Sequence, residues 1–338
     1  MIKDIRNYSL LRHNTFGIDV KCRRFIEFTT TDEARHVVEM LSDDDTPLLL
    51  LGGGSNLLFT ADYDRTVLHS AIKGCSHVEE DGTILLRCGS GETWDDVVAM
   101  CVRNGWHGME NLSLIPGEVG ASAVQNIGAY GAEAKDVIDT VEVVEIATGE
   151  VFTFSNVDCQ YAYRQSRFKH EWRGRFIVTH VTYRLSTRFT PDLDYGNVRA
   201  ELDRDGISQP TASQLRDVII KIRRAKLPDP EVEGNAGSFF MNPVVNRKKY
   251  EELAARYVNM PHYVIDNDHI KIPAGWMIDQ CGWKGRTLGR AGVHSKQALV
   301  LVNRGGATGK DIVNLCEAIR HDVNERFGIN ICPEVNIF

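Results

Sequence analysis

The sequence predicts an α+β protein, in which strands and helices alternate in some segments and strands pair as a hairpin in another. Its 338 residues correspond to two or three compact units, at about 150 residues per unit. Hydrophobic residues make up 43% and charged residues 25% of the chain, as in globular proteins. This composition excludes a disordered or low-complexity protein, and a chain of this length can bury a large core.

The first predicted unit contains a strand–helix–strand pattern that ends in a glycine-rich turn. Thr30 and Glu33 form a capping-box pattern, which predicts the start of the helix. The second strand is wholly apolar, as expected for a strand in a buried parallel sheet. The predicted strand, helix, strand and turn lie at Cys22–Phe28, Thr30–Met40, Pro47–Leu51 and Gly52–Asn56.

A second unit is predicted to begin near Thr66 and to end at the rigid, proline-rich segment Leu227–Pro230. Asn104-Gly105 is expected to end a helix, and Thr148-Gly149 supplies turn residues for a hairpin. The predicted strands are Thr83–Cys88, Val141–Ala147, Val151–Phe154 and Phe176–Leu185. The predicted helices are Thr93–Arg103 and Ser213–Ala225.

The last predicted unit combines three helices with two strands. Thr308 and Asp311 have the spacing of a helix cap, and Gly328 is expected to end the long helix that they begin. Two shorter helices and two strands are predicted at Arg247–Tyr257, Ala274–Cys281, Ala298–Val302 and Ile329–Phe338.

The net charge and the cysteines of the chain indicate which binding partners and which cellular compartment to expect. The formal net charge of −7 is opposite in sign to the charge by which a whole protein attracts nucleic acid or an anionic membrane. No apolar run approaches the roughly 18 residues of a membrane span, and the charged start does not resemble a secretory signal. Because no CxxC motif occurs, we expect reduced thiols in a bacterial-type cytoplasm, without a zinc site or a disulfide framework. The eight cysteines are Cys22, Cys75, Cys88, Cys101, Cys159, Cys281, Cys316 and Cys332.

Two glycine-rich segments approach known nucleotide-binding motifs but fail at defined positions. Gly89–Trp94 follows a strand and opens a helix, yet Trp94 stands where a dinucleotide fingerprint needs its third glycine. Gly305–Asp311 also joins a strand to a helix, but Arg304 and Asp311 replace the first glycine and the hydroxyl residue of a P-loop. We therefore expect an ordinary turn at the first segment and a helix cap at the second.

Five other segments are richer in glycine, charge or special turns than their surroundings. The turn after Leu51 places unhindered backbone N–H groups in succession, a pattern that can bind phosphate oxygens. The small residues of Ile115–Gly131 allow a flat ring or a pyrophosphate to lie against the backbone. The remaining three segments are Tyr161–Lys169, Lys226–Pro243 and Pro333–Val335.

The motifs GGGSN, IPGEVGASAVQNIGAYG, YRQSRFK, KLPDP, GNAGSFFMNP and PEV occur here in the order found in the UDP-N-acetylenolpyruvoylglucosamine reductase (MurB) family. The resemblance covers essentially the whole chain, and the motifs are highly specific in combination. Tyr195-Gly196, before the third unit, resembles the tyrosine loop of the long form of that family.

This resemblance implies a vanillyl-alcohol-oxidase-type FAD-binding fold of two α/β subdomains, followed by a substrate-binding α/β domain. It implies subdomain 1 at residues 1–65, joined by the terminal strand 329–338, subdomain 2 at 66–225, and the substrate domain at 226–328. The family binds FAD noncovalently and uses NADPH to reduce it. UDP-N-acetylglucosamine enolpyruvate then replaces NADP and is reduced to UDP-N-acetylmuramate, a peptidoglycan precursor. The family also implies a cytoplasmic monomer.

Roles for individual residues follow from their places in the family motifs. Ser238 is expected to donate the proton, while Arg164 and Glu334 bracket the substrate carboxylate and stabilise an enolate-like intermediate. The substrate-binding residues implied around the UDP group are Tyr195, Lys226, Asn242 and Gln297. The cofactor-binding residues implied are Gly52, Gly53, Gly54, Ser55, Asn56, Ile115, Pro116, Gly117, Gly120 and Ser122. No metal is implied.

Elementary chemistry agrees with these catalytic roles. A planar guanidinium such as Arg164 can stabilise, with two hydrogen bonds, the charge that hydride addition places on the carboxylate. Glu334 would repel that carboxylate if ionised, so we expect either a raised pKa for Glu334 or a proton shared with the intermediate. Ser238 is a weak acid and needs a neighbouring cation. Taken singly, these residues also suit a surface arginine, an edge-strand carboxylate and a turn serine; their joint occurrence within the ordered motifs favours the catalytic roles.

The sequence departs from the family motifs at two positions, and two alternative functions stay open. Met241 stands where the family often has lysine, and Cys332 stands where it commonly has histidine. A flavin oxidase of the same fold stays open, although no histidine lies beside the GGGSN turn to bind FAD covalently. A nucleotide-sugar-binding protein that has lost the chemistry is the second alternative, against which the three catalytic candidates argue.

Overall fold

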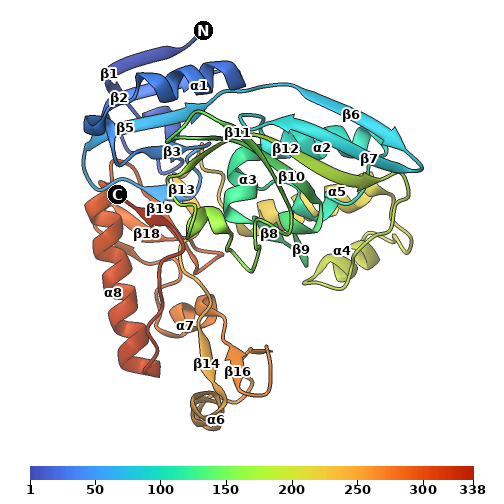
Figure 1. Cartoon of the computed structure of the whole chain (residues 1–338). Coiled ribbons are helices and arrows are strands. Elements are labelled where there is room, and N and C mark those ends of the chain that lie inside the picture. The colour runs from blue at the N-terminus through green and yellow to red at the C-terminus, as the bar shows by residue number, and fades with distance from the viewer. The chain divides into compact units, whose positions relative to one another are not determined.

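A computed structural model describes all residues, 1–338 (Figure 1). These residues form two compact units. Unit 1 comprises residues 1–9, 21–54 and 64–224. Unit 2 comprises residues 10–20, 55–63 and 225–338. The finer division into three domains at residues 66 and 226 stays a prediction.

Unit 1 begins with a four-stranded sheet in the order β1-β2-β5-β3. Its strands are β1 (Lys3–Ser9), β2 (Lys21–Phe28), β5 (Tyr63–Ser70) and β3 (Leu49–Leu51). β3 pairs in parallel with β5, as its apolar sequence predicts, whereas β1 and β2 are antiparallel. Helix α1 (Thr31–Met40) begins as predicted, because Thr30 Oγ1 accepts a 3.0 Å hydrogen bond from the Glu33 N–H. The Glu33 carboxylate accepts from Thr29 rather than from Thr30.

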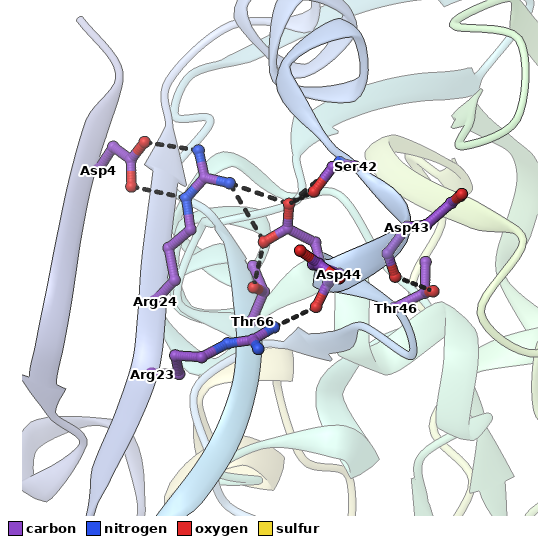
Figure 2. Close-up of polar contacts among 9 residues, drawn as sticks. Asp4, Arg23, Arg24, Ser42, Asp43, Asp44, Thr46 and Thr66 are labelled. Atoms are coloured by element: carbon purple, nitrogen blue, oxygen red, sulfur yellow. Dashed lines mark hydrogen bonds and ion pairs between the residues drawn. The ribbon is translucent and has the colours of Figure 1, made fainter.

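A polar network ties this sheet to the segment that precedes β3 (Figure 2). The Arg24 guanidinium on β2 donates to Asp4 on β1 at 2.7 Å and to Asp45 at 3.1 Å. Asp45 is 6% exposed and also accepts a 2.6 Å hydrogen bond from Thr66 on β5. Burial opposes ionisation of Asp45, but hydrogen bonds from Thr66 and Ser42 outweigh it and hold its pKa below the usual value. The network therefore fixes the chain just before β3.

The second sheet of unit 1 has five strands in the order β11-β10-β12-β7-β6. They are β11 (Val151–Ser155), β10 (Ile138–Glu145), β12 (Phe176–Ser186), β7 (Thr83–Gly89) and β6 (Cys75–Glu80). β10 and β11 form the predicted hairpin, with Val144 opposite Val151. Neighbouring strands in this sheet are antiparallel, and the whole of β6 is an exposed edge.

Four helices and a small hairpin complete unit 1. They are α2 (Trp94–Asn104), α3 (Val119–Gln125), α4 (Val198–Arg204), α5 (Ala212–Lys226, whose last two residues belong to unit 2), β8 (Gly128–Ala129) and β9 (Ala132–Glu133). Trp94 is fully buried in the core with β7 and β12, and its indole N–H donates to the Leu112 carbonyl at 2.9 Å. Gly105 ends α2 in the left-handed conformation, with φ +70°. The segment Gly89–Trp94 is therefore a turn into a helix, as expected.

Helix α1 packs between the two sheets of unit 1. Ala34 and Val37 of α1 share a buried cluster with Phe28 of β2 and with Val144 and Ile177 of the second sheet. This shared core joins both sheets in one unit. A smaller cluster joins α4 to α5.

Unit 2 contains three small sheets. The first has the order β13-β19-β18-β17, formed by Asn235–Ser238, Val300–Asn303, Ala291–Val293 and Thr287–Leu288. The second has the order β14-β16-β15, formed by Val244–Asn246, His269–Lys271 and Tyr263–Val264. The third pairs β20 (Asn336–Ile337) in parallel with β4 (Leu57–Leu58). The prediction of a strand over the whole of Ile329–Phe338 was therefore wrong. Before β20, this segment forms only an isolated antiparallel bridge between Pro333 and Phe240, because proline has no backbone N–H with which to extend a ladder.

The helices of unit 2 are α6 (Arg247–Arg256), α7 (Ala274–Gln280) and α8 (Gly309–Phe327), at the predicted positions. Thr308 and Asp311 form a complete capping box, and Gly328 ends α8 in the left-handed conformation. Asp311 accepts hydrogen bonds from the Thr308 N–H and hydroxyl, so Gly305–Asp311 is a helix cap, as expected. No helix in the protein is both long enough and apolar enough to span a membrane.

Candidate functional site

The glycine turn after β3 lies against the segment Ile115–Ser122. A Cβ added at Gly52 would lie 3.1 Å from the Ala121 Cβ, and one added at Gly53 would lie 3.2 Å from the Gly117 Cα. Gly54 has φ +65°, a conformation that favours glycine. The two glycine-rich segments therefore meet through their backbones.

Backbone hydrogen bonds hold the second glycine-rich segment to the turn between β7 and α2. The Val119 N–H donates to the Glu92 carbonyl at 2.9 Å, and the Gly120 N–H donates to the Ser90 carbonyl at 2.8 Å. A Cβ at Gly120 would lie 2.8 Å from the Ser90 Cβ, so only glycine fits there. Ser122 is fully buried, and its hydroxyl contacts the Val119 carbonyl and the Tyr183 hydroxyl.

A buried histidine on β5 connects this segment to the first sheet. His69 Nε2 lies 3.2 Å from a Glu118 oxygen, and His69 Nδ1 lies 2.9 Å from a Glu27 oxygen. Burial opposes protonation of His69, but the hydrogen bonds to Glu118 and Glu27 outweigh it and raise its pKa. The His69 imidazole therefore bridges two carboxylates and holds Glu118 beside Gly52.

The residues at this contact fit the FAD that the sequence implies. Because Gly52 and Gly53 have no side chains, the two backbones approach closely, and N–H groups of both segments could then face one bound phosphate or ring. Gln125, at the end of α3, has a buried Nε2 with no hydrogen-bond partner in the protein. The Nδ2 of Asn56, in unit 2, is buried in the same way. Within unit 1, the Gln125 amide is suited to donate to an oxygen atom of a bound group.

Arg164 is half-buried in unit 1, and its guanidinium is oriented by backbone carbonyls. Its Nη2 donates to the Gly128 carbonyl at 2.8 Å and its Nη1 to the Asn126 carbonyl at 3.4 Å. The guanidinium also lies over the Tyr163 ring, 5.3 Å from its centroid. Arg164 has φ +56°, and Lys169 Nζ donates to its carbonyl at 2.8 Å. These contacts are more than an ordinary surface arginine makes.

Tyr195 lies beside the end of the glycine-rich segment of unit 1. A Cβ at Gly131 would lie 3.2 Å from the Tyr195 Cβ, so these two chain segments are in contact. The Asn111 side chain donates to the Tyr130 carbonyl at 2.8 Å and to the Asp192 carbonyl at 3.0 Å, which ties the segments together. The Tyr195 side chain itself is 51% exposed.

Ser238 and Glu334 lie on two segments of unit 2 that a backbone hydrogen bond joins. Ser238 is exposed at the end of β13 and follows Gly237, which has φ +68°. The Glu334 N–H donates to the carbonyl of Phe239 at 2.8 Å, and Phe239 and Phe240 are buried. The two buried rings anchor the segment, so the adjacent serine and glutamate are held at one end of the first sheet.

Two of the four substrate-binding candidates lie at the start of α7. The Asn242 Oδ1 accepts a 2.9 Å hydrogen bond from the Ala274 N–H. A Cβ at Gly275 would lie 3.4 Å from the Gln297 Oε1. Lys226 is exposed at the end of α5. Of the predicted residues, unit 2 therefore contains Ser55, Asn56, Lys226, Ser238, Asn242, Gln297 and Glu334, and unit 1 contains the others.

The sequence interpretation missed two residues that organise unit 1. Asn126 is fully buried, and its amide donates to Glu133 and to the Ala162 carbonyl, each at 2.8 Å. It thereby holds the loop that carries Arg164. An asparagine followed by an apolar residue and glycine is a signal for its left-handed conformation, φ +46°. The other is His69, whose role depends on Glu27 and Glu118 and left no local signal.

Known protein families match both the N-terminal and the C-terminal part of the chain. A family model for an FAD-binding domain matches residues 23–155, and a model for the C-terminal domain of UDP-N-acetylenolpyruvoylglucosamine reductase matches residues 229–338. The chain is 56% identical to the reductase of that name from Bacteroides fragilis, over 98% of this chain and 99% of the relative. It is 46% identical to the one from Porphyromonas gingivalis, over 98% of each chain.

The fold agrees with a solved structure. The crystal structure of the reductase from Thermus caldophilus aligns with a TM-score of 0.67 at 21% sequence identity. That alignment covers 100% of this chain and 99% of the other, so the two share the FAD-binding α+β fold. Together with the full-length similarity to the two bacterial relatives, this shows that the chain belongs to the UDP-N-acetylenolpyruvoylglucosamine reductase family.

Proposed function

We propose that this protein uses FAD and NADPH to reduce UDP-N-acetylglucosamine enolpyruvate to UDP-N-acetylmuramate in peptidoglycan precursor synthesis. One observation carries the proposal: a single chain contains both the FAD-binding domain and the reductase C-terminal domain, at 56% identity to a full-length reductase. Bound FAD would accept a hydride from NADPH and pass it to the enolpyruvyl double bond.

In this proposal the backbone of Gly52–Gly54 and Ile115–Ser122 holds the dinucleotide. The close approach of Gly52 to Ala121 and of Gly53 to Gly117 supports this role, since N–H groups of both segments could then face the same phosphate oxygens. The His69 bridge to Glu118 keeps the second segment in place.

Arg164 is proposed to bind the substrate carboxylate. Its bonds to the Gly128 and Asn126 carbonyls support this role, because a guanidinium with a fixed plane loses little freedom when it binds an anion. The charge that develops on the carboxylate during reduction is then stabilised by a preorganised cation.

Ser238 is proposed to donate the proton, while Glu334, together with Arg164, is proposed to bracket the substrate carboxylate and to stabilise the enolate-like intermediate. The hydrogen bond between the Glu334 N–H and the Phe239 carbonyl supports a shared site for the two residues. The exposure of Ser238 at a strand end leaves its hydroxyl accessible to a substrate. Tyr195, Lys226, Asn242 and Gln297 are proposed to contact the UDP group.

The finer features of the molecule are also proposals. We place FAD within residues 1–65 and 66–225, and the substrate domain at 226–328. We further propose that the protein is a cytoplasmic monomer, as the family resemblance implies. Light scattering during size-exclusion chromatography should give a mass near 37.9 kDa, and a dimer mass would contradict the monomer.

The activity is tested by spectroscopy on the purified protein. Flavin absorption should move wholly to the supernatant on acid precipitation, as expected for noncovalent FAD. NADPH should then bleach the holoprotein without air, and the enolpyruvyl nucleotide should restore the colour and yield UDP-N-acetylmuramate by mass spectrometry. Colour that stays in the pellet, or reoxidation by air but not by the nucleotide, would indicate an oxidase instead. A protein that refuses added FAD would overturn the proposal.

A further inference from the structure

We propose that Cys75 and Cys88 form a dithiol site that peroxides oxidise reversibly to an intramolecular disulfide. Cys75 lies on the exposed edge strand β6, and Cys88 lies directly opposite on β7. Their sulfur atoms are 3.2 Å apart. This site lies outside the proposed catalytic machinery, and its chemistry does not depend on the proposed function.

The strand register is suited to a disulfide. The Gly89 N–H donates to the Gly74 carbonyl at 2.9 Å, so residues 74 and 89 are a hydrogen-bonded pair. Hydrogen-bonded and non-hydrogen-bonded pairs alternate in an antiparallel ladder, which makes Cys75 and Cys88 a non-hydrogen-bonded pair. In such pairs the Cα atoms are about 4.5 Å apart, within the range of about 4.4–6.8 Å that disulfides span. Both side chains also project from the same face of the sheet.

The surrounding backbone holds the two strands in this register. The Gly91 N–H donates to the Ile72 carbonyl at 3.0 Å, and the Lys73 ammonium donates to the Gly91 carbonyl. A Cβ at Gly91 would lie 2.5 Å from the Ser70 carbonyl oxygen, so only glycine allows this approach. The sulfur atoms therefore need only a small side-chain movement to reach bonding distance.

The two thiols are suited to different steps of the oxidation: one to attack the peroxide, the other to form the disulfide. Cys75 is exposed, whereas Cys88 is fully buried. The hydrogen bond with Cys88 lowers the pKa of Cys75, and the Lys73 ammonium acts in the same direction against burial and Glu92. The hydrogen bond with Cys75 and burial raise the pKa of Cys88. Cys75 is therefore the thiolate that attacks, and Cys88 is the thiol that resolves.

The oxidation balances with hydrogen peroxide as the oxidant. The Cys75 thiolate attacks one peroxide oxygen, the O–O bond breaks, and hydroxide leaves and takes up a proton to form water. This produces a sulfenic acid on Cys75. The Cys88 sulfur then attacks the Cys75 sulfur, the S–S bond forms, the S–O bond breaks, and a second water leaves. Two thiols lose two electrons and two protons, and the peroxide is reduced to two waters. Disulfides of this reversible kind are the ones that cytosolic proteins form.

The other exposed cysteine provides an internal reference. Cys332 lies in unit 2 and is exposed, whereas Cys75 faces Cys88 across a strand pair. Cys101, the next cysteine after Cys88, is buried, and its sulfur lies 3.8 Å from the Met109 sulfur. Peroxide should therefore act on Cys332 without producing an intramolecular disulfide.

Peptide mapping of the full-length, reduced protein tests this proposal. After treatment with one equivalent of hydrogen peroxide, free thiols are alkylated and the chain is digested with trypsin. Cleavage after Lys73 and Arg87 separates Cys75 from Cys88, so a disulfide links the peptides Gly74–Arg87 and Cys88–Arg103. We expect this linked pair as the main oxidised product, with Cys88 rather than Cys101 assigned by fragmentation, and its loss on treatment with dithiothreitol. Full alkylation of Cys75 and Cys88 after peroxide, or a link to any other cysteine, would overturn the proposal.

Two variants separate the steps. In Cys88→Ser, the Cys75 sulfenic acid should accumulate and be trapped by dimedone at least tenfold more than in the unmodified sequence. In Cys332→Ser, the linked peptides should form as before. Equal dimedone labelling of Cys75 with and without Cys88 would contradict the resolving role. If Cys88→Ser does not fold, the peptide map of the unmodified sequence still decides whether the disulfide forms.

Discussion

At the scale of single residues, Ser238 is the position where the proposed chemistry is easiest to separate from binding. It is exposed after a left-handed glycine, and its hydroxyl makes no contact that the fold of β13 requires. We expect Ser238→Ala to bind FAD and to be reduced by NADPH at an unchanged rate. Reoxidation by the enolpyruvyl nucleotide should slow by about 10²–10⁴-fold, because a positioned proton donor is lost. Anaerobic stopped-flow absorbance measures the two half-reactions separately.

The exposed Ser208→Ala variant controls for loss of a hydroxyl elsewhere. Glu334→Gln should impair the same half-reaction as Ser238→Ala and leave reduction by NADPH intact. If either catalytic-site variant slowed both half-reactions equally, its residue would act in folding or flavin binding rather than in proton transfer.

His69 makes the stability of unit 1 depend on pH. Its folded-state pKa is raised, so its contribution is fully present below 6.5, the value of an unperturbed histidine, and is lost as the pH rises through the folded-state pKa. His69→Gln removes this titration, and the urea midpoint should then fall less between about pH 6 and about pH 8 than in the unmodified sequence. The surface variant His36→Gln, at a side chain 63% exposed, should keep the full pH dependence. An unchanged slope in His69→Gln would show that the bridge to Glu118 and Glu27 has no energetic role.

At the scale of elements, β1, β2 and β5 depend on one guanidinium. The Arg24 side chain is 14% exposed and the Asp45 side chain is 8% exposed, so Arg24→Ala leaves a buried carboxylate without its cation (Figure 2). We expect a loss of about 3 kcal/mol in the free energy of unfolding, measured with urea. Because the pKa of Asp45 is depressed, this contribution is present above pH 3.8 and is lost as the pH falls through the folded-state value.

The neighbouring Arg23 is the matched control for this prediction. It donates to the Asp44 backbone carbonyl rather than to a carboxylate, so Arg23→Ala should cost less than about 1 kcal/mol. Equal losses in the two variants would mean that the Arg24–Asp45 pair contributes nothing beyond one hydrogen bond.

The contact between the two glycine-rich segments is also a property of elements rather than of one residue. Gly53→Val would push methyl groups against Gly117, whose Cα would lie 3.2 Å from the new Cβ. We expect the variant to fold but to bind FAD at least tenfold more weakly, measured by the change in flavin fluorescence on titration. Gly53→Ala should have a smaller effect, since only one atom is added. If Gly53→Val bound FAD with normal affinity, the contact between Gly53 and Gly117 would not be part of the flavin site.

At the scale of the whole molecule, the cofactor and the fold are coupled. If FAD binds only the folded chain, FAD at 100 times its Kd should add about 2.7 kcal/mol to the free energy of unfolding. The urea midpoint of the apoprotein should therefore rise with FAD concentration, and riboflavin, which lacks the pyrophosphate, should have a smaller effect. A midpoint that does not move with FAD would show that the flavin site is absent from the folded protein.

The sequence by itself determined most local structure and the family. Helix ends were readable because capping and stop signals such as Thr30, Thr308 and Gly328 act within a few residues. The family was readable because its motifs are short, ordered and specific. The failed expectation at Ile329–Phe338 has a local cause as well, since Pro333 cannot donate to a ladder.

Tertiary structure alone decided which distant residues meet. Gly53 contacts Gly117, His69 joins Glu27 to Glu118, and Cys75 pairs with Cys88 across two strands. No local pattern encodes these contacts, because they follow from strand register and sheet order rather than from spacing along the chain. The partners of a carboxylate, an imidazole or a thiol, and with them its charge at a given pH, are therefore settled only when the chain has folded.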